Sequence, residues 1–421
     1  MIRLVSIFLI LEGLCALPSL SSSSTWHVHQ DGSGDATTIQ AVIDFATGGD
    51  TILVGAGIYL ENLRIVGKDI VLKSEQGITA TTIDGSGIQE TTIYLSGQTR
   101  ATVIEGFTIT GGIGHLRGST VVGGGAFFDN GSSATIQGNH FTENGTIPTT
   151  YYGGATAVNG TIEAPLLRNN TFERNQAKLG GAVIPGIGSE IRDNIFINNA
   201  CQLDGGAIYT IFNSGVVSIE GNQFLENTAG DHGGAVYVGG QSSSQILIRW
   251  NLFIRNQAAG STRDYLAGGS LFISKVHGTV TNNTIVGTIA PTWSTCGGGA
   301  LSLRSVPANL DISANIFALN HCSGVTCRYG TENTLGPNLF WMNDCPNLGY
   351  YPAACPSQWA SGQIYSDPLF CGSAIDDFTV SSNSPALIGP VLMGFNTVPG
   401  CGQTGVAVRR STWGQLKTRF H

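Results

Sequence analysis

A repeat of about 29 residues in the middle of the chain constrains its fold more than any other feature. The tripeptide Gly-Gly-Ala, or Gly-Gly-Ser in one copy, recurs with spacings of 25 to 35 residues, beginning at Gly124, Gly153, Gly180, Gly205, Gly233, Gly268 and Gly298. A unit of this size cannot bury its apolar face alone and buries it by stacking on neighbouring copies. The repeat therefore predicts a solenoid.

A second motif, Asn-x-Phe-x-x-Asn, follows the Gly-Gly corners. Clear copies begin at Asn139, Asn170, Asn194, Asn222, Asn251 and Asn315. A degenerate copy keeps Asn283 and Ile285, and we assign Gly287 to the position of its last Asn. An aliphatic residue precedes the first Asn by three positions in most copies. The unit is thus a short strand, an Asn turn, a Phe-bearing strand, a second Asn turn and a Gly-Gly turn, and stacking pairs each strand with its copies in parallel.

The repeated residue types have physical roles in such a coil. Asn tolerates the left-handed backbone of a sharp turn, and its amide can donate to one coil while accepting from another. Paired Gly allows backbone conformations that a side chain forbids. The Phe residues are expected to stack inside the coil: Phe141, Phe172, Phe196, Phe224, Phe253 and Phe317.

The ends of the chain depart from the repeat. Residues 1–24 have a positive start, an apolar stretch and small residues, which is typical of a secretory signal peptide. Residues 25–50 include a helical pattern with Ile39, Val42, Ile43 and Ala46 on one face, which suits an N-terminal cap. We place the coils at 51–325 and a Cys-rich closing coil, cap and tail at 326–421.

Cysteine use favours an oxidising compartment. Eight cysteines follow the signal region, and six of them lie between Cys322 and Cys401, so disulfides should staple the C-terminal cap. Cys296 and Cys322 flank one coil and could form a bridge across one rung. Cys201 lies several coils from Cys296, beyond the reach of a disulfide. Without a CxxC spacing, the cysteines predict no metal site.

Composition excludes several classes of partner. Only 11% of the 421 residues are charged, the net charge is -8, and Lys and Arg do not cluster. Nucleic acid phosphates and anionic membrane surfaces both require a concentrated basic face. No later apolar run is long enough for a transmembrane segment. From the signal-like segment and the cysteine use, the chain is expected outside the cell or at its surface.

The N-terminal segments Thr38-Ile-Gln-Ala-Val-Ile-Asp and Gly49-Asp-Thr-Ile-Leu-Val resemble the start of right-handed parallel β-helix proteins of the pectin-lyase-like superfamily. The Gly-Gly-Ala and Phe-x-x-Asn repeats are similar to those of chlamydial polymorphic outer membrane proteins. Asp367-Pro-Leu-Phe resembles the closing coil of bacterial secreted β-helices. The resemblance implies an all-β, right-handed parallel β-helix with a helical N-terminal cap and a disulfide-rich C-terminal cap. It specifies function poorly, because such folds include lyases, hydrolases, esterases, epimerases and adhesins.

The local signatures of the enzymatic branches are missing. The Gln-Asp-Thr-Leu segment of pectin methylesterases, the Gly-His-Gly of polygalacturonases, the Trp-Ile-Asp-His of pectate lyases and the Asp-Pro-His of mannuronan epimerases do not occur. Asp376 and Asp377 are adjacent on an expected strand and point to opposite faces, so they do not suit glycoside hydrolysis.

Aligning the repeats brings distant residues into columns. Tyr209, Tyr237 and Phe272 stand two positions after the Ala or Ser of successive copies, and alternation along a strand makes them an outward ladder. In one interpretation, the aromatic rings stack only for stability; in the other, they form a carbohydrate-binding platform. In the copies before these, the same alignment places Phe128, Ala157 and Ile184 in this column.

The residues before each Gly-Gly form a second column, in which Asp204 and His232 are one coil apart. They are either tolerated turn residues or a catalytic pair in which His232 is a general base or acid. Asp231, Arg263, Asp264 and Lys275 could add charge for an anionic substrate or for calcium, but no metal ligand set or cofactor is assigned.

These observations favour a secreted or surface-exposed β-helix that binds a polysaccharide, a cell-surface glycan or another cell-surface partner in the manner of an adhesin. A polysaccharide lyase or glycoside hydrolase is the first alternative, and a structural envelope protein is the second. Neither a particular ligand nor an oligomeric state follows from the sequence.

Overall fold

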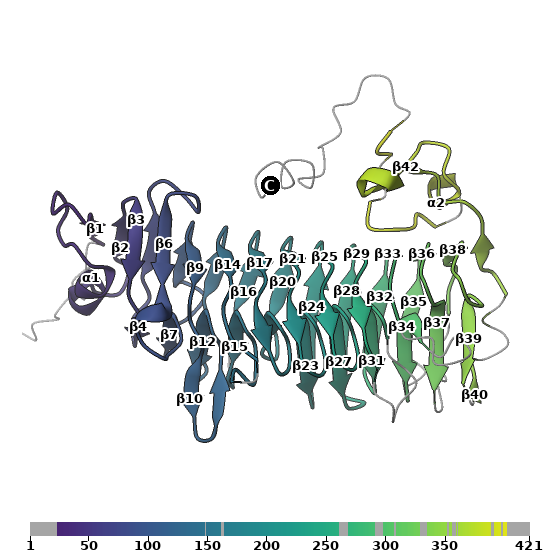
Figure 1. Cartoon of the computed structure of the whole chain (residues 1–421), viewed down its shortest axis with the longest axis horizontal. Coiled ribbons are helices and arrows are strands. Elements are labelled where there is room, and N and C mark those ends of the chain that lie inside the picture. The colour runs from purple at the N-terminus through teal and green to yellow at the C-terminus, as the bar shows by residue number, and fades with distance from the viewer. Residues whose placement is uncertain are drawn as a thin grey trace, which may run out of the picture.

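The computed structural model describes residues 23–147, 149–160, 164–260, 268–290, 298–306, 309–328, 335–351, 353–355, 359, 361–388, 391–396 and 399–401. Within them the chain winds into a rod of stacked coils, and three long sheets run along the rod (Figure 1). The expected signal peptide up to residue 22, Arg263, Asp264, Cys296 and the tail at 411–421 lie outside the described residues.

Each full coil contributes one short strand to each long sheet, and neighbouring strands in a sheet are parallel up to β39. The first sheet contains β1 (Thr25–Val28), β2 (Thr51–Val54), β5 (Val71–Ser74), β8 (Val103–Glu105), β13 (Thr135–Gln137), β16 (Leu166–Arg168), β20 (Glu190–Arg192), β24 (Gly215–Glu220), β28 (Ser244–Arg249), β32 (His277–Thr281) and β35 (Leu310–Ser313). The second contains β3 (Gly57–Leu60), β6 (Thr81–Asp84), β9 (Thr108–Thr110), β14 (His140–Thr142), β17 (Thr171–Glu173), β21 (Ile195–Ile197), β25 (Gln223–Leu225), β29 (Leu252–Ile254), β33 (Thr284–Val286), β36 (Ile316–Ala318), β38 (Leu339–Trp341) and β41 (Ile364–Tyr365).

The third sheet contains β4 (Leu63–Val66), β7 (Ile93–Ser96), β12 (Ala126–Asp129), β15 (Thr156–Val158), β19 (Val183–Ile184), β23 (Ile208–Phe212), β27 (Val236–Gly240), β31 (Leu271–Ser274), β34 (Gly299–Arg304), β37 (Ser323–Arg328), β39 (Leu348–Tyr351) and β40 (Ala353–Ala354), of which β39 and β40 are antiparallel. A narrow fourth sheet contains β18 (Gln176–Ala177), β22 (Ala200–Cys201), β26 (Thr228–Ala229) and β30 (Gln257–Ala258). The predicted solenoid of parallel strands is confirmed.

The interior of the rod is apolar, and its most regular feature is a stack of Phe rings on the second sheet. Ring centroids lie 5.1 Å apart for Phe141 and Phe172 and 4.7 Å apart for Phe224 and Phe253, and these rings are fully buried. Stacked rings of this kind add to the stabilisation from burial alone. The stack predicted from the repeats is confirmed, with Ile285 interrupting it.

Buried Asn side chains form two ladders along the rod, one on each side of the second sheet. In the first, each Oδ1 accepts from the backbone N–H of the preceding member: Asn139, Asn170, Asn194, Asn222, Asn251, Asn283, Asn315 and Asn338. The second contains Asn144, Asn175, Asn199, Asn227, Asn256, Thr288, Asn320 and Asn343. Thr288, rather than Gly287, occupies the last position of the degenerate copy.

The left-handed corner residue is not the ladder Asn itself. Most of the non-Gly residues with φ between 45° and 59° directly precede a ladder position: Glu143, Asn169, Arg174, Asp193, Asn198, Glu226, Trp250, Arg255, Asn282, Ala314, Leu319 and Met342. The chain turns at this preceding residue, so the Asn that follows can direct its amide into the coil. The ladder prediction is confirmed, but the expected left-handed Asn is wrong by one position.

The first Gly-rich corner is also shifted by one residue from the repeat alignment. Ala126 pairs with Thr156 and Phe127 pairs with Ala157, so Gly123 to Gly125 correspond to the Gly-Gly-Ala that begins at Gly153. Phe127 therefore faces outward and Phe128 faces the interior, where it joins the main core. Three consecutive Gly residues left this register ambiguous in the sequence.

The N-terminal end of the rod carries one short helix, α1 (Ile39–Phe45), which lies beside β1, β2 and β4 (Figure 1). Its buried face contains Ile39, Val42 and Ile43, as the helical pattern predicts. No helix among the described residues is long and apolar enough to cross a membrane. A hairpin of β10 (His115–Arg117) and β11 (Thr120–Val122) projects beside the third sheet (Figure 1).

Residues 366–401 form a C-terminal strap, described apart from 389–390 and 397–398. It contains the hairpin of β42 (Phe370–Gly372) and β43 (Asp377–Val380) and the short helix α2 (Pro385–Ile388). Phe378, Val380 and Met393 pack on outward apolar residues of the second sheet. The segment expected to close the end of the rod therefore lies along its side (Figure 1).

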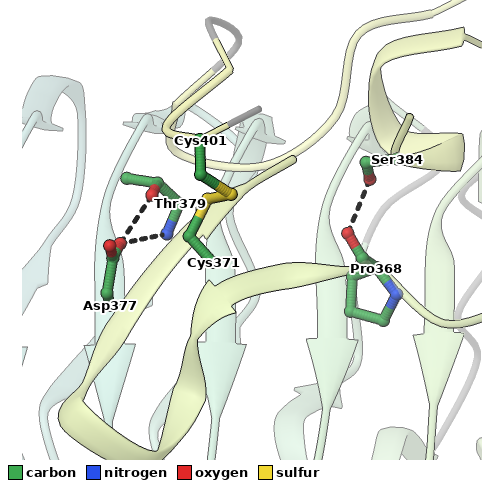
Figure 2. The surroundings of a disulfide bond; sticks show 6 residues. All are labelled: Pro368, Cys371, Asp377, Thr379, Ser384 and Cys401. Carbon is green, nitrogen blue, oxygen red and sulfur yellow. Dashed lines mark hydrogen bonds between the residues drawn. A yellow bond between two sulfur atoms is a disulfide. The ribbon is translucent and has the colours of Figure 1, made fainter. Parts of the chain in front are cut away.

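The strap is held together locally by a disulfide and short hydrogen bonds. Figure 2 shows the Cys371–Cys401 bridge beside Thr379, whose backbone N and Oγ1 donate to Asp377. Ser384 Oγ donates to the Pro368 carbonyl at 2.6 Å.

A second disulfide joins Cys327 to Cys355. Cys201 and Cys322 are buried free thiols, so the expected Cys296–Cys322 bridge does not form. Cys322 belongs to the interior core, and its Sγ lies 3.9 Å from the Thr288 carbonyl oxygen.

Candidate functional site

The outer face of the third sheet carries a column of side chains that includes the predicted aromatic ladder. Strand pairing aligns Tyr94, Phe127, Ala157, Ile184, Tyr209, Tyr237, Phe272 and Ser302. The ring centroids of Tyr209 and Tyr237 are 5.1 Å apart, as are those of Tyr237 and Phe272. The alternate positions Ile208, Val236 and Leu271 are fully buried in the core, as alternation along a strand requires.

Only part of this ladder is accessible. Tyr209 and Tyr237 are half-buried, whereas Phe272 has no exposed surface. Burial raises the pKa of Tyr237 to about 12 and raises the pKa of Tyr209 above its ordinary range. Phe272 therefore supports Tyr237 from one side and is not placed to contact a ligand, which corrects its assignment as a carbohydrate-binding residue.

A groove of about 430 Å³ opens where the column changes from large to small side chains. It is lined by Arg117, Val122, Phe127, Tyr152, Ala157, Val158, Asn159, Ile184, Pro185, Tyr209, Thr210 and Ile211. Ala157 and Ile184 form its floor because they are smaller than the aromatic residues on either side. Arg117 brings a cation from the projecting hairpin.

Sequence reasoning missed Tyr94 and Phe127 as members of this surface, and their rings lie 6.1 Å apart. The shifted first corner concealed them, because it moved Phe128 into the outward column. No repeat motif marks β7 in the sequence, and only the pairing of β12 with β7 in the structure reveals Tyr94. The guanidinium of Arg64 lies 4.3 Å from the Tyr94 ring centroid, within the range of a cation–π interaction.

Asp204 and His232 lie on adjacent coils at one edge of the same sheet. The Asp204 Oδ1 is 2.9 Å from His232 Nδ1 and accepts the His232 backbone N–H at 3.1 Å. The Asp231 Oδ1 lies 3.4 Å from the same Nδ1. The imidazole also packs on Phe272, with ring centroids 4.7 Å apart. The structure thus brings the predicted pair into contact beside the aromatic column.

This arrangement determines which nitrogen of His232 can react. With the Nδ1 proton directed at Asp204, the Nε2 carries the free electron pair. Nε2 is buried and has no hydrogen-bond partner among the described residues. The ligand atoms of Asp204, Asp231 and His232 lie within 4.8 Å of one another, but Nδ1 stands between the two carboxylates. The geometry is therefore that of an oriented imidazole rather than of a calcium cage, which needs six or more oxygens.

A comparison with known protein families supports the β-helix fold. Residues 68–253 match the family model described as the right handed β-helix region. Comparison with curated protein sequences finds no match.

Among solved structures, the chain is similar to the A-module of the Azotobacter vinelandii mannuronan C-5 epimerase AlgE4, with 15% identity, 76% of this chain and 94% of that chain covered, and a TM-score of 0.39. It is also similar to pectin methylesterase from carrot, with 13% identity, coverage of 85% and 91%, and a TM-score of 0.30. Pectin methylesterase from Aspergillus niger is 12% identical, with 84% of this chain and 99% of that chain covered and a TM-score of 0.28.

Proposed function

We propose that the groove on the third sheet binds a polysaccharide or a cell-surface glycan. The observation that supports this proposal is the groove itself, in which half-buried Tyr209 and Tyr152 stand beside the aliphatic residues Ala157 and Ile184. Sugar rings present apolar C–H faces that pack on aromatic rings, and their hydroxyls need hydrogen-bond partners at the edges. Arg117 and Asn159 supply such partners.

Charge near the groove favours an acidic glycan. Arg117 lines it, and Lys178 Nζ lies 4.5 Å from the ring centroid of Tyr151, which packs on Tyr152 at 4.6 Å. Two cations beside an apolar floor attract carboxylated sugars in a chain whose net charge is otherwise negative. The long rod offers further coils along which a polymer can extend.

The proposal includes export and an adhesin-like role. The disulfides Cys327–Cys355 and Cys371–Cys401 and the signal-like residues 1–24 support an oxidising destination. The likeness of the repeats to those of chlamydial polymorphic outer membrane proteins supports a place at the cell surface. The helix α1 is proposed to protect the N-terminal end of the rod from pairing with other chains.

Binding to an array of acidic and neutral polysaccharides tests this function. A protein of residues 25–421 is expected to bind at least one acidic polymer. The double variant Tyr209→Ala, Arg117→Ala should bind that polymer at least 10-fold more weakly. Val66→Ser is the matched control, because Val66 is an exposed apolar residue on β4 of the same sheet that does not line the groove. Retention that is equal in all variants would place any binding elsewhere, and no retention of any polymer would contradict the proposal.

A second candidate function is cleavage of the bound polymer, and the contact of Asp204 with His232 beside the aromatic column favours it. A neutral imidazole oriented by Asp204 can accept a proton from a water molecule in hydrolysis, or from the carbon next to a sugar carboxylate in elimination. Both reactions generate new reducing ends. Release of reducing ends by the parent chain but not by His232→Gln, with equal folding of the two, would establish this role. Equal release would assign the chemistry to another site.

A further inference from the structure

At the N-terminal edge of the rod, three potential metal ligands converge from two strands of the first sheet. His27 lies on β1, His29 follows directly after it, and Glu75 follows β5, two strands away. His27 Nδ1 is 3.0 Å from Glu75 Oε1, and His29 Nε2 is 3.3 Å from Glu75 Oε2. These three residues have no part in the groove on the third sheet.

The hydrogen bonds around His29 leave two acceptors facing each other. The Ser33 hydroxyl donates to Asp31 at 2.7 Å, so its oxygen accepts from His29 Nδ1 at 2.8 Å. If the His29 imidazole is neutral, its one N–H proton is on Nδ1 and is donated to Ser33 Oγ. The free electron pair of Nε2 then faces the Glu75 carboxylate oxygen. Such a pair of acceptors requires a positive charge between them. A bound cation meets this requirement, and an excess proton on the imidazole is the competing explanation.

The spacing of the ligand atoms suits a metal ion. Ligands about 2.1 Å from an ion are separated by roughly 3.0 Å in octahedral geometry and by roughly 3.4 Å in tetrahedral geometry. The His27–Glu75 and His29–Glu75 separations, 3.0 and 3.3 Å to different oxygens of Glu75, fall in this interval, and the ligand atoms of the three residues lie within 4.8 Å of one another. The Ser33 contact provides the outer hydrogen bond that usually fixes the orientation of a ligating His.

The surrounding chain makes room for the His29 ring and for further ligands. A Cβ added at Gly55 would lie 2.5 Å from the His29 Cδ2, so any larger residue at position 55 would displace the ring. A cavity of about 400 Å³ adjoins the cluster and is lined by His29, Asp31, Glu75 and their neighbours. Water or a small anion can enter it.

We infer that His27, His29 and Glu75 bind a divalent transition-metal ion, with remaining coordination positions open to this cavity. Imidazole and carboxylate ligands together suit Zn²⁺ and related ions better than Ca²⁺, which prefers oxygen alone. The ion joins the outermost strand β1 to β5 across the intervening β2.

Cobalt titration of the chelator-treated full chain tests the site, because Co²⁺ bound by nitrogen and oxygen ligands absorbs visible light. One saturable Co²⁺ site is expected, from which Zn²⁺ displaces the cobalt. Glu75→Gln, which preserves shape, and His29→Ala should each weaken binding at least 10-fold. Gly55→Ala should also weaken it, although every ligand remains. Circular dichroism establishes that each variant is folded.

Two control variants separate this site from other clusters. His321→Ala removes an exposed imidazole whose Nδ1 lies 2.8 Å from the Asp344 carboxylate. Asp231→Asn alters the cluster around His232. Both variants should bind Co²⁺ as the parent chain does. Absence of a saturable site, or binding unchanged by Glu75→Gln, would overturn the inference and leave a protonated His29 beside Glu75. Loss of binding only in Asp231→Asn would also overturn it.

Discussion

The carboxylate of Asp204 holds both N–H groups of His232, a residue 28 positions later in the chain. One oxygen, Oδ1, lies 2.9 Å from the ring Nδ1 and 3.1 Å from the backbone N. The distance is short because the two residues occupy the same position on adjacent coils. This contact both stabilises the edge of the third sheet and orients the imidazole, and these two roles respond differently to substitution.

Asp204→Ala should lower the free energy of unfolding by about 1–3 kcal/mol, because it leaves the buried backbone N–H of His232 without its acceptor and leaves the ring Nδ1 only the more distant Asp231 oxygen. Asp204→Asn should cost much less, since its amide oxygen still accepts. Urea unfolding of the two variants measures the difference. Equal losses would mean that the charge of Asp204, rather than its oxygen, provides the stabilisation.

Tyr237 should make the protein less stable at alkaline pH. Burial, with Asp204 nearby, raises its pKa to about 12 in the folded chain, whereas the unfolded value is about 10. Between these values the unfolded chain loses the proton while the folded chain retains it, so stability falls as pH rises. Unfolding at about pH 9 and about pH 11 should show a smaller alkaline loss in Tyr237→Phe. An identical loss would indicate that Tyr237 ionises normally.

Substitution of an Asn at any interior position of the second ladder should lower the stability of the fold. Asn227 Oδ1 accepts from the Asn199 backbone N at 3.1 Å, and its Nδ2 donates to the Phe196 carbonyl at 2.9 Å. Asn227→Ala leaves buried groups on the preceding coil unpaired and should cost about 2–4 kcal/mol, as the sum of more than one lost bond. Asn213→Ala, at an exposed position, should change stability little. Comparable melting temperatures for both variants would contradict a stabilising ladder.

The ladder also shows how far sequence reasoning reaches in this fold. The repeat revealed the Asn and Phe columns because their side chains are required in every coil. The left-handed corner carries residues as different as Glu143, Arg174 and Trp250, so no residue type marked it. At this corner the geometry is imposed by the coil, against a local cost of about 1–2 kcal/mol.

The candidate site was predicted only in part, for two physical reasons. The contact of Asp204 with His232 followed from the repeat register, but the burial of Phe272 depends on packing that periodicity does not describe. The cluster of His27, His29 and Glu75 lies before the regular repeats, where strand pairing has no sequence marker. The docking of the strap on the second sheet involves residues more than 100 positions apart, such as Arg255 and Asp376.

Acid should weaken the N-terminal edge through Asp50. Backbone N–H groups of Ser24 and Thr47, at 2.8 and 2.9 Å, together with Trp26 Nε1, lower the pKa of this carboxylate to about 2. Its contribution is complete above the ordinary Asp value near 4 and is lost as pH falls toward 2. Asp50→Asn should therefore be less stable at neutral pH and show a smaller acid dependence. Thermal unfolding at several pH values, followed by Trp fluorescence, provides the measurement.

The strap should loosen without unfolding of the rod when Arg255 is removed. Its guanidinium donates to Asp376 at 3.0 Å and to Glu226 at 2.7 Å, and Asp376 is only 9% exposed. These acidic partners raise the pKa of Arg255, so the pair stays charged at any pH at which the carboxylates are ionised. Arg255→Ala should cost the strap about 1.5–3 kcal/mol.

Hydrogen exchange resolves this loss by segment, because 1.4 kcal/mol corresponds to a tenfold change in local opening. In Arg255→Ala, amides of β43 should exchange roughly 10- to 100-fold faster, while those of β25 and β29 stay protected. Arg174→Ala is a matched control, since Arg174 also precedes a ladder Asn and pairs with Glu143 at 3.1 Å. It should leave exchange of the strap unchanged. Faster exchange in both the strap and the rod of Arg255→Ala would mean instead that the two unfold as one unit.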